Sequence, residues 1–213
     1  MPELAYSRTR HVADLQEGSD RDVLAALQRD DEVALDELIR RKTQPLVQVA
    51  YRVLGSLEEA QDVVQMAFVR IWENRHRYQP AWSPNTWIYR ITTNLAIDSL
   101  RSRRSRERVQ EPLRLHVERG HQERSSRGVG SLGDREVHAI FRELAAELTE
   151  KQRAIFVLRE MEGLSSKEVA VIVGCRESTV RNHLFNARRV LRDELVRRFP
   201  EYAPAAGATE GPT

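Results

Sequence analysis

Apolar residues recur at intervals of three and four along most of this chain, and the alternation typical of strands is absent. Spacing by three and four places apolar side chains on one face of an α-helix, whereas a half-buried strand alternates with a period of two. The pattern therefore predicts an all-α protein. Its first helix begins after Ser19 or Asp20. The second begins near Asp30 and meets Pro45, which should kink it or start a new helix, and Gly55 ends it.

The segment from 57 to 74 has the most regular helical pattern. Ser56 and Glu59 have the spacing of a capping box at its start. One predicted face is apolar and forms core, and it comprises Ala60, Val63, Val64, Ala67, Phe68 and Ile71. The opposite face comprises Asp62, Gln65, Met66, Val69 and Glu73. Because Met66 and Val69 lie where a solvated face would be polar, this face is a candidate contact surface, although isolated exposed apolar residues also occur without a function.

A loop containing two prolines, residues 78–85, leads into a further helix from Thr86 to about Arg104. Its predicted core side carries Ile88, Ile91 and Leu95. Its far side carries Thr86, Arg90, Thr93, Ile97 and Arg101, and it runs into the arginine-rich residues 101–108. We expect this far side to be exposed and basic at its end.

Apolar periodicity divides the chain into two helical units. It fails between 109 and 133, where glycine, proline, serine and charged residues predict a flexible linker. The first unit then spans 19–108 and the second spans 134–199. We expect residues 1–18 to be flexible and the proline-, alanine- and glycine-rich tail, 200–213, to be disordered.

Charge is sorted along the chain although the formal net charge is only +2. Residues 11–62 contain twelve acidic and six basic side chains, whereas seven arginines lie between 176 and 198. Two basic clusters, at 101–108 and 176–198, suggest a polyanion held at two places, and solvated helix faces are the alternative explanation. The single cysteine, Cys175, excludes an internal disulfide, and no apolar stretch approaches the roughly 20 residues that span a bilayer. We expect a cytoplasmic protein without a metal or cofactor.

The second unit has the spacing of a helix-turn-helix. Thr149 with Gln152 caps one helix, and Ser165 with Glu168 caps a short helix that Gly174 ends. A long helix follows, and its core stripe comprises Val180, Leu184, Ala187, Leu191 and Leu195. Small Ala170 at the crossing, Gly174 in the turn and Val180 in the core fit a DNA-reading module.

The start of the long helix carries side chains suited to phosphate and base-edge contacts. They are Arg176, Ser178, Thr179, Arg181, Asn182, His183, Asn186 and Arg189. The alternative is a helical protein-binding domain with a solvated basic helix, which would not require the short first helix and Gly174 together.

Both units resemble one known family. The first contains SLEEAQDVVQMAFVRIWEN at 56–74 and TWIYRITTNLAIDSLRSRRSR at 86–106, which resemble region 2 of bacterial sigma-70 factors of the extracytoplasmic-function (ECF) group. The second contains LTEKQRAIFVLREMEGLSSKEVAVIVGCRESTVRNHLFNARRVLR at 148–192, which resembles region 4. The resemblance covers both units in the order the family has them.

The resemblance implies a dissociable initiation subunit of RNA polymerase. It places Asp62, Gln65, Met66 and Val69 on the clamp helices of the largest polymerase subunit, and region 4 near the flap. It assigns recognition and melting of the minus-ten element to Tyr78, Trp82, Arg90, Asn94, Arg101 and Arg104. It assigns the minus-thirty-five element to the eight residues of the long helix named above, and an anti-sigma factor is a usual partner in the group.

Two other classes of function remain to be weighed. A stand-alone helix-turn-helix regulator would leave the first unit unexplained, and it should dimerise and bind DNA without polymerase. An enzyme is disfavoured because the sequence contains no metal-ligand cluster, phosphate loop or nucleophile constellation. We therefore expect no catalytic residues.

Overall fold

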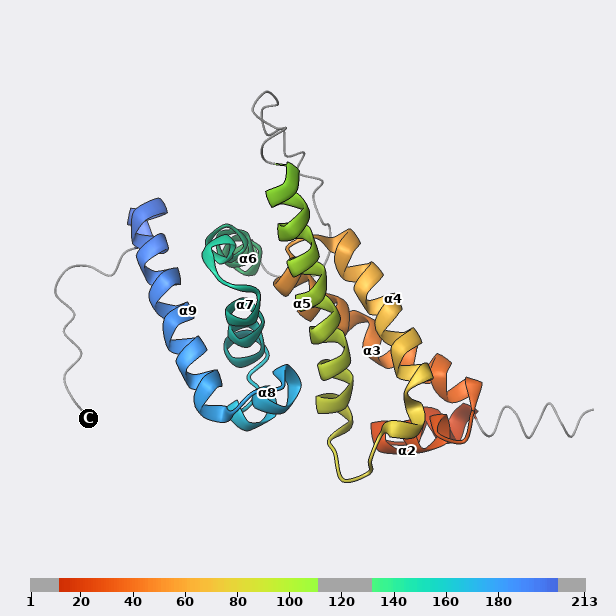
Figure 1. Cartoon of the computed structure of the whole chain (residues 1–213). Coiled ribbons are helices and arrows are strands. Elements are labelled where there is room, and N and C mark those ends of the chain that lie inside the picture. The colour runs from red at the N-terminus through yellow and green to blue at the C-terminus, as the bar shows by residue number, and fades with distance from the viewer. Residues whose placement is uncertain (1–11, 111–131, 203–213) are drawn as a thin grey trace, which may run out of the picture.

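The computed structural model describes residues 12–110 and 132–202, in which the regular elements are helices (Figure 1). The helices form two packed groups. The first group contains α2 (Asp20–Leu27), α3 (Glu32–Leu54), α4 (Leu57–Glu73), η1 (Arg75–Arg77) and α5 (Pro84–Gln110). The second contains α6 (Leu132–Leu144), η3 (Ala145–Glu147), α7 (Glu150–Phe156), η4 (Val157–Met161), α8 (Ser166–Val173), α9 (Glu177–Arg198) and η5 (Pro200–Tyr202).

The two groups confirm the all-α prediction and the predicted division of the chain, with shifts at the borders. Helix α5 extends to Gln110, two residues into the predicted linker, and most of that linker, 111–131, lies outside the described residues. Residues Pro200–Tyr202 form a short 3₁₀ turn, so the tail predicted from 200 begins with regular structure. The rest of the tail, 203–213, also lies outside the described residues.

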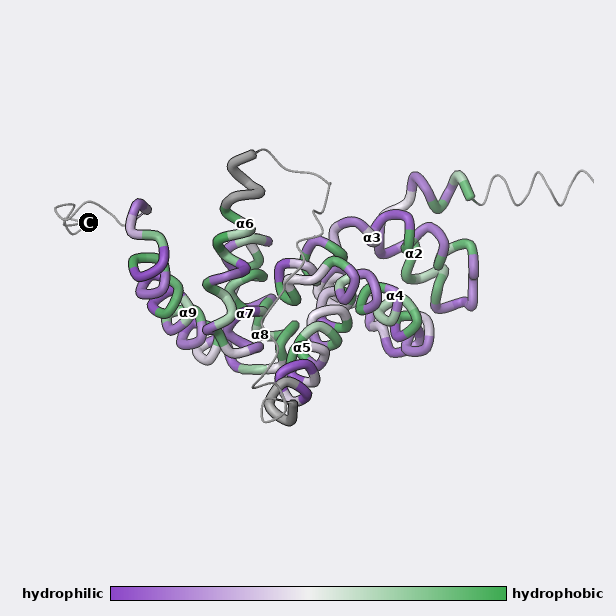
Figure 2. The backbone as a smooth tube through the Cα atoms, turned by 90° about the horizontal axis from the view of Figure 1, so that it is seen from above, coloured by the Kyte–Doolittle hydropathy of each residue, from purple (hydrophilic) through white to green (hydrophobic). Residues whose placement is uncertain are grey.

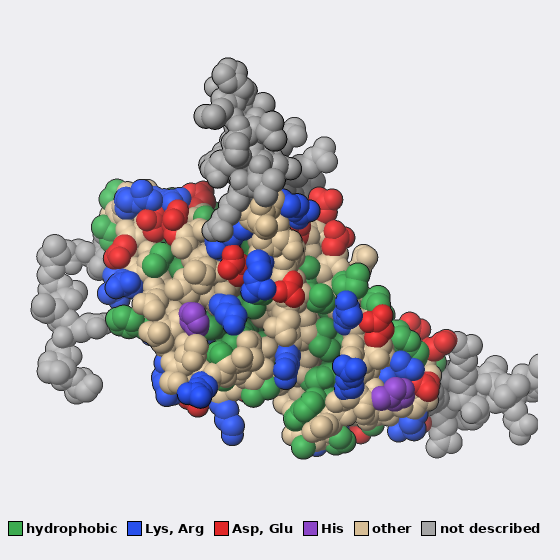
Figure 3. Space-filling view, in the orientation of Figure 1, with side chains coloured by type: hydrophobic (Ala, Val, Ile, Leu, Met, Phe, Trp, Pro, Cys, Tyr) green, Lys and Arg blue, Asp and Glu red, His purple; other side chains and the backbone are tan. Residues whose placement is uncertain are grey.

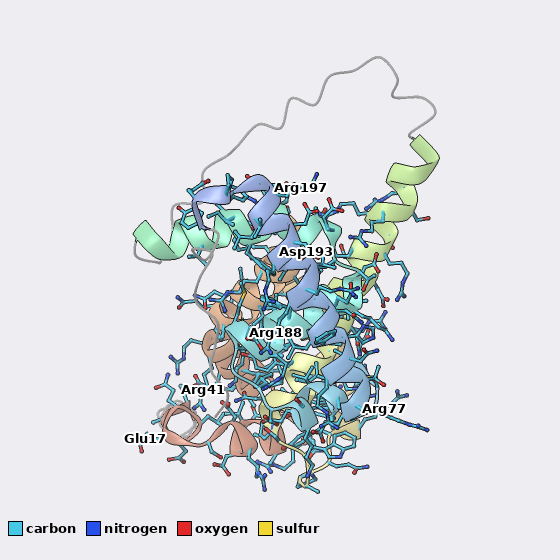
Figure 4. The ribbon with its side chains drawn as sticks, turned by 90° about the vertical axis from the view of Figure 1, so that its left-hand side faces the viewer. Glu17, Arg41, Arg77, Arg188, Asp193 and Arg197 are labelled. Carbon is cyan, nitrogen blue, oxygen red and sulfur yellow. The ribbon has the colours of Figure 1, made fainter. Side chains whose placement is uncertain are left out.

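The first group begins earlier than the sequence predicts. Residues 12–17 are helical and Leu15 is buried, so the prediction that 1–18 is flexible is wrong for this stretch. The guanidinium of Arg41 on α3 donates to the carbonyl oxygens of Leu15, at 2.6 Å, and Gly18, at 2.8 Å. Figure 4 labels Glu17 and Arg41 in this corner of the molecule. A single arginine thus attaches the N-terminal helical turn to α3.

Helix α3 continues through Pro45 as one helix, so the alternative that a new helix starts there is wrong. Proline removes one backbone N–H donor, at a cost of about 3 kcal/mol in a helix interior. Leu38, Leu46 and Val49 are buried on the same helix, before and after the proline. Burial of each such side chain is worth about 1.5–3 kcal/mol, so packing outweighs the lost hydrogen bond. Gly55 then ends the helix at a positive φ of 79°.

Only one of the two hydrogen bonds of the predicted capping box of α4 is present. The Ser56 hydroxyl accepts the backbone N–H of Glu59 at 3.3 Å, as expected. The Glu59 carboxylate does not bond back to Ser56 and accepts instead from the Arg103 guanidinium of α5 at 2.8 Å. A tertiary ion pair has displaced the local hydrogen bond.

Helix α5 lies between the two groups and packs against both. It contacts α3 and α4 on one side and α7 and α8 on the other (Figures 1 and 2). Because both sides are covered, Thr93 and Ile97 are buried, and the prediction that they lie on an exposed face is wrong. The Thr93 hydroxyl is buried without a hydrogen-bond partner among the described residues.

Polar side chains also join the two groups. Arg52 of α3 forms an ion pair with Glu162, which follows η4. Arg153 of α7 is 5% exposed, and its guanidinium reaches the carbonyl oxygen of Arg52 at 3.4 Å. Burial, together with the nearby Arg103, lowers the pKa of Arg153 from its ordinary value to about 10. Among the described residues no carboxylate pairs with this buried cation.

The second group forms as the capping signals predict. Full capping boxes begin α7, at Thr149 and Gln152, and α8, at Ser165 and Glu168. The helix after Thr149 does not stay α-helical to its end, because Val157–Met161 widens into the π-helical stretch η4. This widening was not predicted from the sequence.

Candidate nucleic-acid interface

A short helix, a tight turn and a long helix form the helix-turn-helix. Gly174 ends α8 at a φ of 65°, and its N–H donates to the carbonyl oxygen of Ala170. Backbone in this left-handed region favours glycine because a Cβ atom would be strained there. Val180, near the start of α9, is fully buried and packs in the core. The turn and the packing that the sequence predicts are therefore confirmed.

The face of α9 opposite its core stripe is exposed. Of the residues predicted to contact DNA, Arg176, Ser178, Arg181, Asn182 and Arg189 are exposed, and Thr179, His183 and Asn186 are half-buried on the flanks. Figure 4 shows α9 along its length, with Arg188, Asp193 and Arg197 labelled on it.

One prominent residue of this face was missed. Phe185 is 66% exposed, and on a helical projection it lies between Arg181 and Arg189. A search for polar chemistry passes over a phenylalanine, but its place outside the apolar stripe of α9 could have identified it. A large exposed aromatic ring among polar and cationic side chains suits a surface that reads both phosphates and apolar base edges.

The cations on this face are lightly restrained. Arg181 pairs with Glu177 at 2.7 Å, one turn earlier, and Arg188 pairs with Glu160 at 2.8 Å. Exposed pairs of this kind contribute about 0–1 kcal/mol, so a phosphate can displace them. For Arg189, the described residues include no ion-pair partner.

The outer face of α4 forms a second surface. Asp62 and Gln65 are exposed, and Met66 and Val69 are 47% and 50% exposed. Ala60, Val63, Val64, Ala67, Phe68 and Ile71 are buried on the other face, as predicted. The geometry of the candidate contact surface is thus as expected from the periodicity.

The loop before α5 differs from its predicted form at Tyr78. Tyr78 is only 3% exposed, so its predicted role as a surface for stacking on a base is wrong in this conformation. Its ring lies 5.3 Å from that of Trp87, centroid to centroid, and burial raises the pKa of its phenol. Trp82 in the same loop is 39% exposed and remains available.

Some arginines of α5 are exposed, and one is bonded to the second group. Arg90 and Asn94 are exposed, as is Arg101, whose guanidinium lies 3.2 Å from Asp98 on the same helix. Arg104 instead donates to the Glu150 carboxylate at 2.8 Å and to backbone carbonyl oxygens of the second group. In this conformation Arg104 joins the two groups, and its contact with DNA stays a prediction.

The face of the molecule seen in Figure 3 carries mixed charge. Figure 3 shows lysine and arginine side chains spread over both groups, with acidic side chains among them. In residues 12–110 and 132–202, no three His, Cys, Asp or Glu side chains are grouped as metal ligands. No helix in those ranges is long and apolar enough to cross a membrane.

The comparisons agree with this geometry. Residues 38–106 match the family described as Sigma-70 region 2, and residues 138–191 match Sigma-70, region 4. The chain is 33% identical over 171 residues to the "ECF RNA polymerase sigma factor SigE" of Mycolicibacterium smegmatis, covering 80% of this chain and 65% of that protein. It is 28% identical over 186 residues to the "RNA polymerase sigma-H factor" of Pseudomonas aeruginosa, covering 85% of this chain and 96% of that one. The chain thus spans somewhat under two thirds of the first relative and nearly all of the second.

Two solved structures share the fold. CnrH in complex with the cytosolic domain of CnrY aligns with a TM-score of 0.60 and 21% identity, over 85% of this chain and 99% of the other. The sigma factor RpoE from Bartonella quintana, in complex with the anti-sigma factor NepR, aligns with a TM-score of 0.55 and 22% identity, over 77% and 97%. With region 2 matched in the first helical group, region 4 in the second and ECF factors as relatives, the chain belongs to the sigma-70 family, in its extracytoplasmic-function group.

Proposed function

We propose that this chain is a dissociable subunit of bacterial RNA polymerase that directs initiation at specific promoters. One observation carries the proposal: a helix-turn-helix with an exposed reading face shares the chain with a region 2 domain whose α4 presents an outward apolar surface. A stand-alone regulator needs only the first of these. The joint match to regions 2 and 4 disfavours that alternative.

Region 4 would read the minus-thirty-five element with α9. Its exposed face offers hydrogen-bonding groups at Arg181 and Asn182 and a cation at Arg189. The exposed ring of Phe185 would contact an apolar edge such as a thymine methyl group. A face of this composition combines base reading with phosphate binding.

Region 2 would bind polymerase through α4 and open DNA through the loop and outer face of α5. Met66 and Val69 supply apolar contact area, flanked by the polar Asp62 and Gln65. Trp82, whose side chain is exposed, would stack on an unpaired base, and such stacking is worth roughly 1–3 kcal/mol per base. The exposed Arg90, Asn94 and Arg101 follow along α5 as contacts for the displaced strand.

Other features of the proposal follow from the family. The chain would contribute binding surfaces and no catalytic residue, because the polymerase performs the chemistry. It would act in the cytoplasm, where polymerase and promoter meet. The two structural neighbours are complexes with partner proteins, CnrY and NepR, and the latter is named as an anti-sigma factor. We therefore propose that an anti-sigma factor binds this chain.

The test is transcription with purified core polymerase on genomic fragments, with mapping of transcript starts. We expect starts that depend on the added chain. Asp62→Arg and Met66→Glu should abolish binding to core polymerase while circular dichroism stays unchanged. Asp36→Arg, an equivalent charge reversal at an exposed position of α3, is the matched control and should bind normally. Normal core binding by both α4 variants would contradict the assignment of this face.

A further inference from the structure

The loop that carries Trp82 is fixed at its beginning by the corner between α2 and α3. Gln28 donates its side-chain amide to the carbonyl oxygen of Tyr78 at 2.7 Å. Asp30 accepts from the Arg75 guanidinium at 2.6 Å, and that guanidinium lies 4.1 Å from the ring centroid of Trp72. The entry into the loop is thus held by three separate interactions.

Two hydrogen bonds between residues of the loop also fix its shape. The N–H of Trp82 donates to the carbonyl oxygen of Gln79 at 2.8 Å, which makes a tight turn. The Tyr78 hydroxyl donates to the carbonyl oxygen of Trp82 at 3.0 Å. Both backbone polar groups of Trp82 are therefore bonded within the loop, while its indole is exposed.

We infer that Tyr78 is a positioning residue, whose hydroxyl fixes the backbone of Trp82 and so aims the exposed indole at an unpaired base of the minus-ten element. This inference rests on the proposed stacking role of Trp82. Tyr78 itself cannot touch the base, because its ring is buried against Trp87.

The chemistry of the phenol fits this role. A hydroxyl that donates to a carbonyl oxygen must keep its proton, and burial favours the neutral form. A loop fixed before binding loses less conformational freedom when the base arrives, so more of the stacking energy remains to hold the strand open. The packing of the ring would survive the loss of the hydroxyl, which makes Tyr78→Phe a selective test.

The experiment is a double-mutant cycle on holoenzyme. Open-complex formation on linear duplex promoter is followed by permanganate reactivity for wild type, Tyr78→Phe, Trp82→Ala and the double variant. Tyr51→Phe is the matched control, because its hydroxyl lies at the junction of the two domains, 3.4 Å from Arg142, far along the chain from the loop. The same proteins are titrated with a single-stranded minus-ten oligonucleotide, which reports base capture without melting.

We expect Tyr78→Phe to slow opening by roughly two- to tenfold, the range for one hydrogen bond, and to weaken oligonucleotide binding by a similar factor. Trp82→Ala should slow opening further. In the Trp82→Ala background the loss of the hydroxyl should have no additional effect, since the indole it positions is gone. Tyr51→Phe should behave as wild type.

The failures are distinguishable. If Trp82→Ala opens duplex at the normal rate, the proposed role of the loop fails and the inference falls with it. If Trp82→Ala is slow and Tyr78→Phe is normal, the inference alone is overturned. Equal slowing by Tyr78→Phe in both backgrounds would also overturn it, because the hydroxyl would then act by a route that does not pass through Trp82.

Discussion

Removing the Arg104 guanidinium should loosen the contact between region 2 and region 4. This side chain crosses from the end of α5 to Glu150 at 2.8 Å and to the carbonyl oxygens of Ala146 at 3.0 Å and Leu148 at 2.6 Å. Its side chain is 34% exposed and that of Glu150 is 20% exposed, so solvent screens the ion pair in part.

The magnitude follows from these three bonds. A partly exposed ion pair contributes about 0–1 kcal/mol, and each hydrogen bond to a carbonyl oxygen contributes about 1 kcal/mol. We therefore expect Arg104→Ala to weaken the docking of the two regions by about 2–3 kcal/mol. At 1.4 kcal/mol for each factor of ten, this is a change of roughly 30- to 140-fold in the docking equilibrium.

Single-molecule energy transfer measures this equilibrium directly. Cysteines introduced at the exposed positions Gln61 on α4 and Arg192 on α9, in a Cys175→Ser background, would carry the dyes. The Arg104→Ala variant should reach a given population of separated regions at a lower urea concentration than wild type. Arg106→Ala is the matched control, because Arg106 is an exposed arginine near the same end of α5.

An unchanged distribution for Arg104→Ala would refute the assignment of this side chain to the domain contact. An equal shift for Arg106→Ala would refute it as well, because it would show a general effect of charge at the end of α5.

Three further predictions concern single side chains. Gly55→Ala should lower the free energy of unfolding by about 1–2 kcal/mol in urea titration, because φ is 79° and the new Cβ would lie 3.1 Å from the Arg153 guanidinium. The hydrogen bond from Arg40 is the main cause that lowers the pKa of Glu37 from 4.5 to about 2. The ionised Glu37 therefore stabilises the fold above pH 4.5, and this contribution is lost as the pH falls toward 2. Glu37→Gln should flatten the acid-denaturation curve between these two pH values. Phe185→Ala should abolish any preference of holoenzyme for thymine over uracil in the minus-thirty-five element. The two bases differ only by the methyl group that the phenylalanine ring would contact.

The sequence was most informative where one local rule decides the outcome. The periodicity of α4 located both its core face and its exposed face, and Gly174 marked the turn of the helix-turn-helix by its need for a positive φ. These features depend on residues within a few positions of each other, so a single sequence contains all the information needed.

Predictions from the sequence failed where contacts between distant segments bury or bond a side chain. Thr93 reads as exposed on an isolated α5 and is buried because a second domain covers that side of the helix. Arg104 reads as a free cation and is bonded to residues more than forty positions away. Tyr78 reads as a loop aromatic, and only the placement of Trp87 shows that it is buried. None of these contacts leaves a local signature.

The hydrogen bonds of Arg41 also extend the folded unit beyond the border that periodicity suggests. Its guanidinium holds the carbonyl oxygens of Leu15, Gln16 and Gly18 at 2.6, 2.9 and 2.8 Å, where the helical stretch 12–17 ends. A chain shortened to start at residue 19, the border that periodicity suggests, would lose these three acceptors and the buried Leu15 together. A protease acting on the native protein should therefore spare this stretch, and a minimal region 2 domain must include residues 15–18.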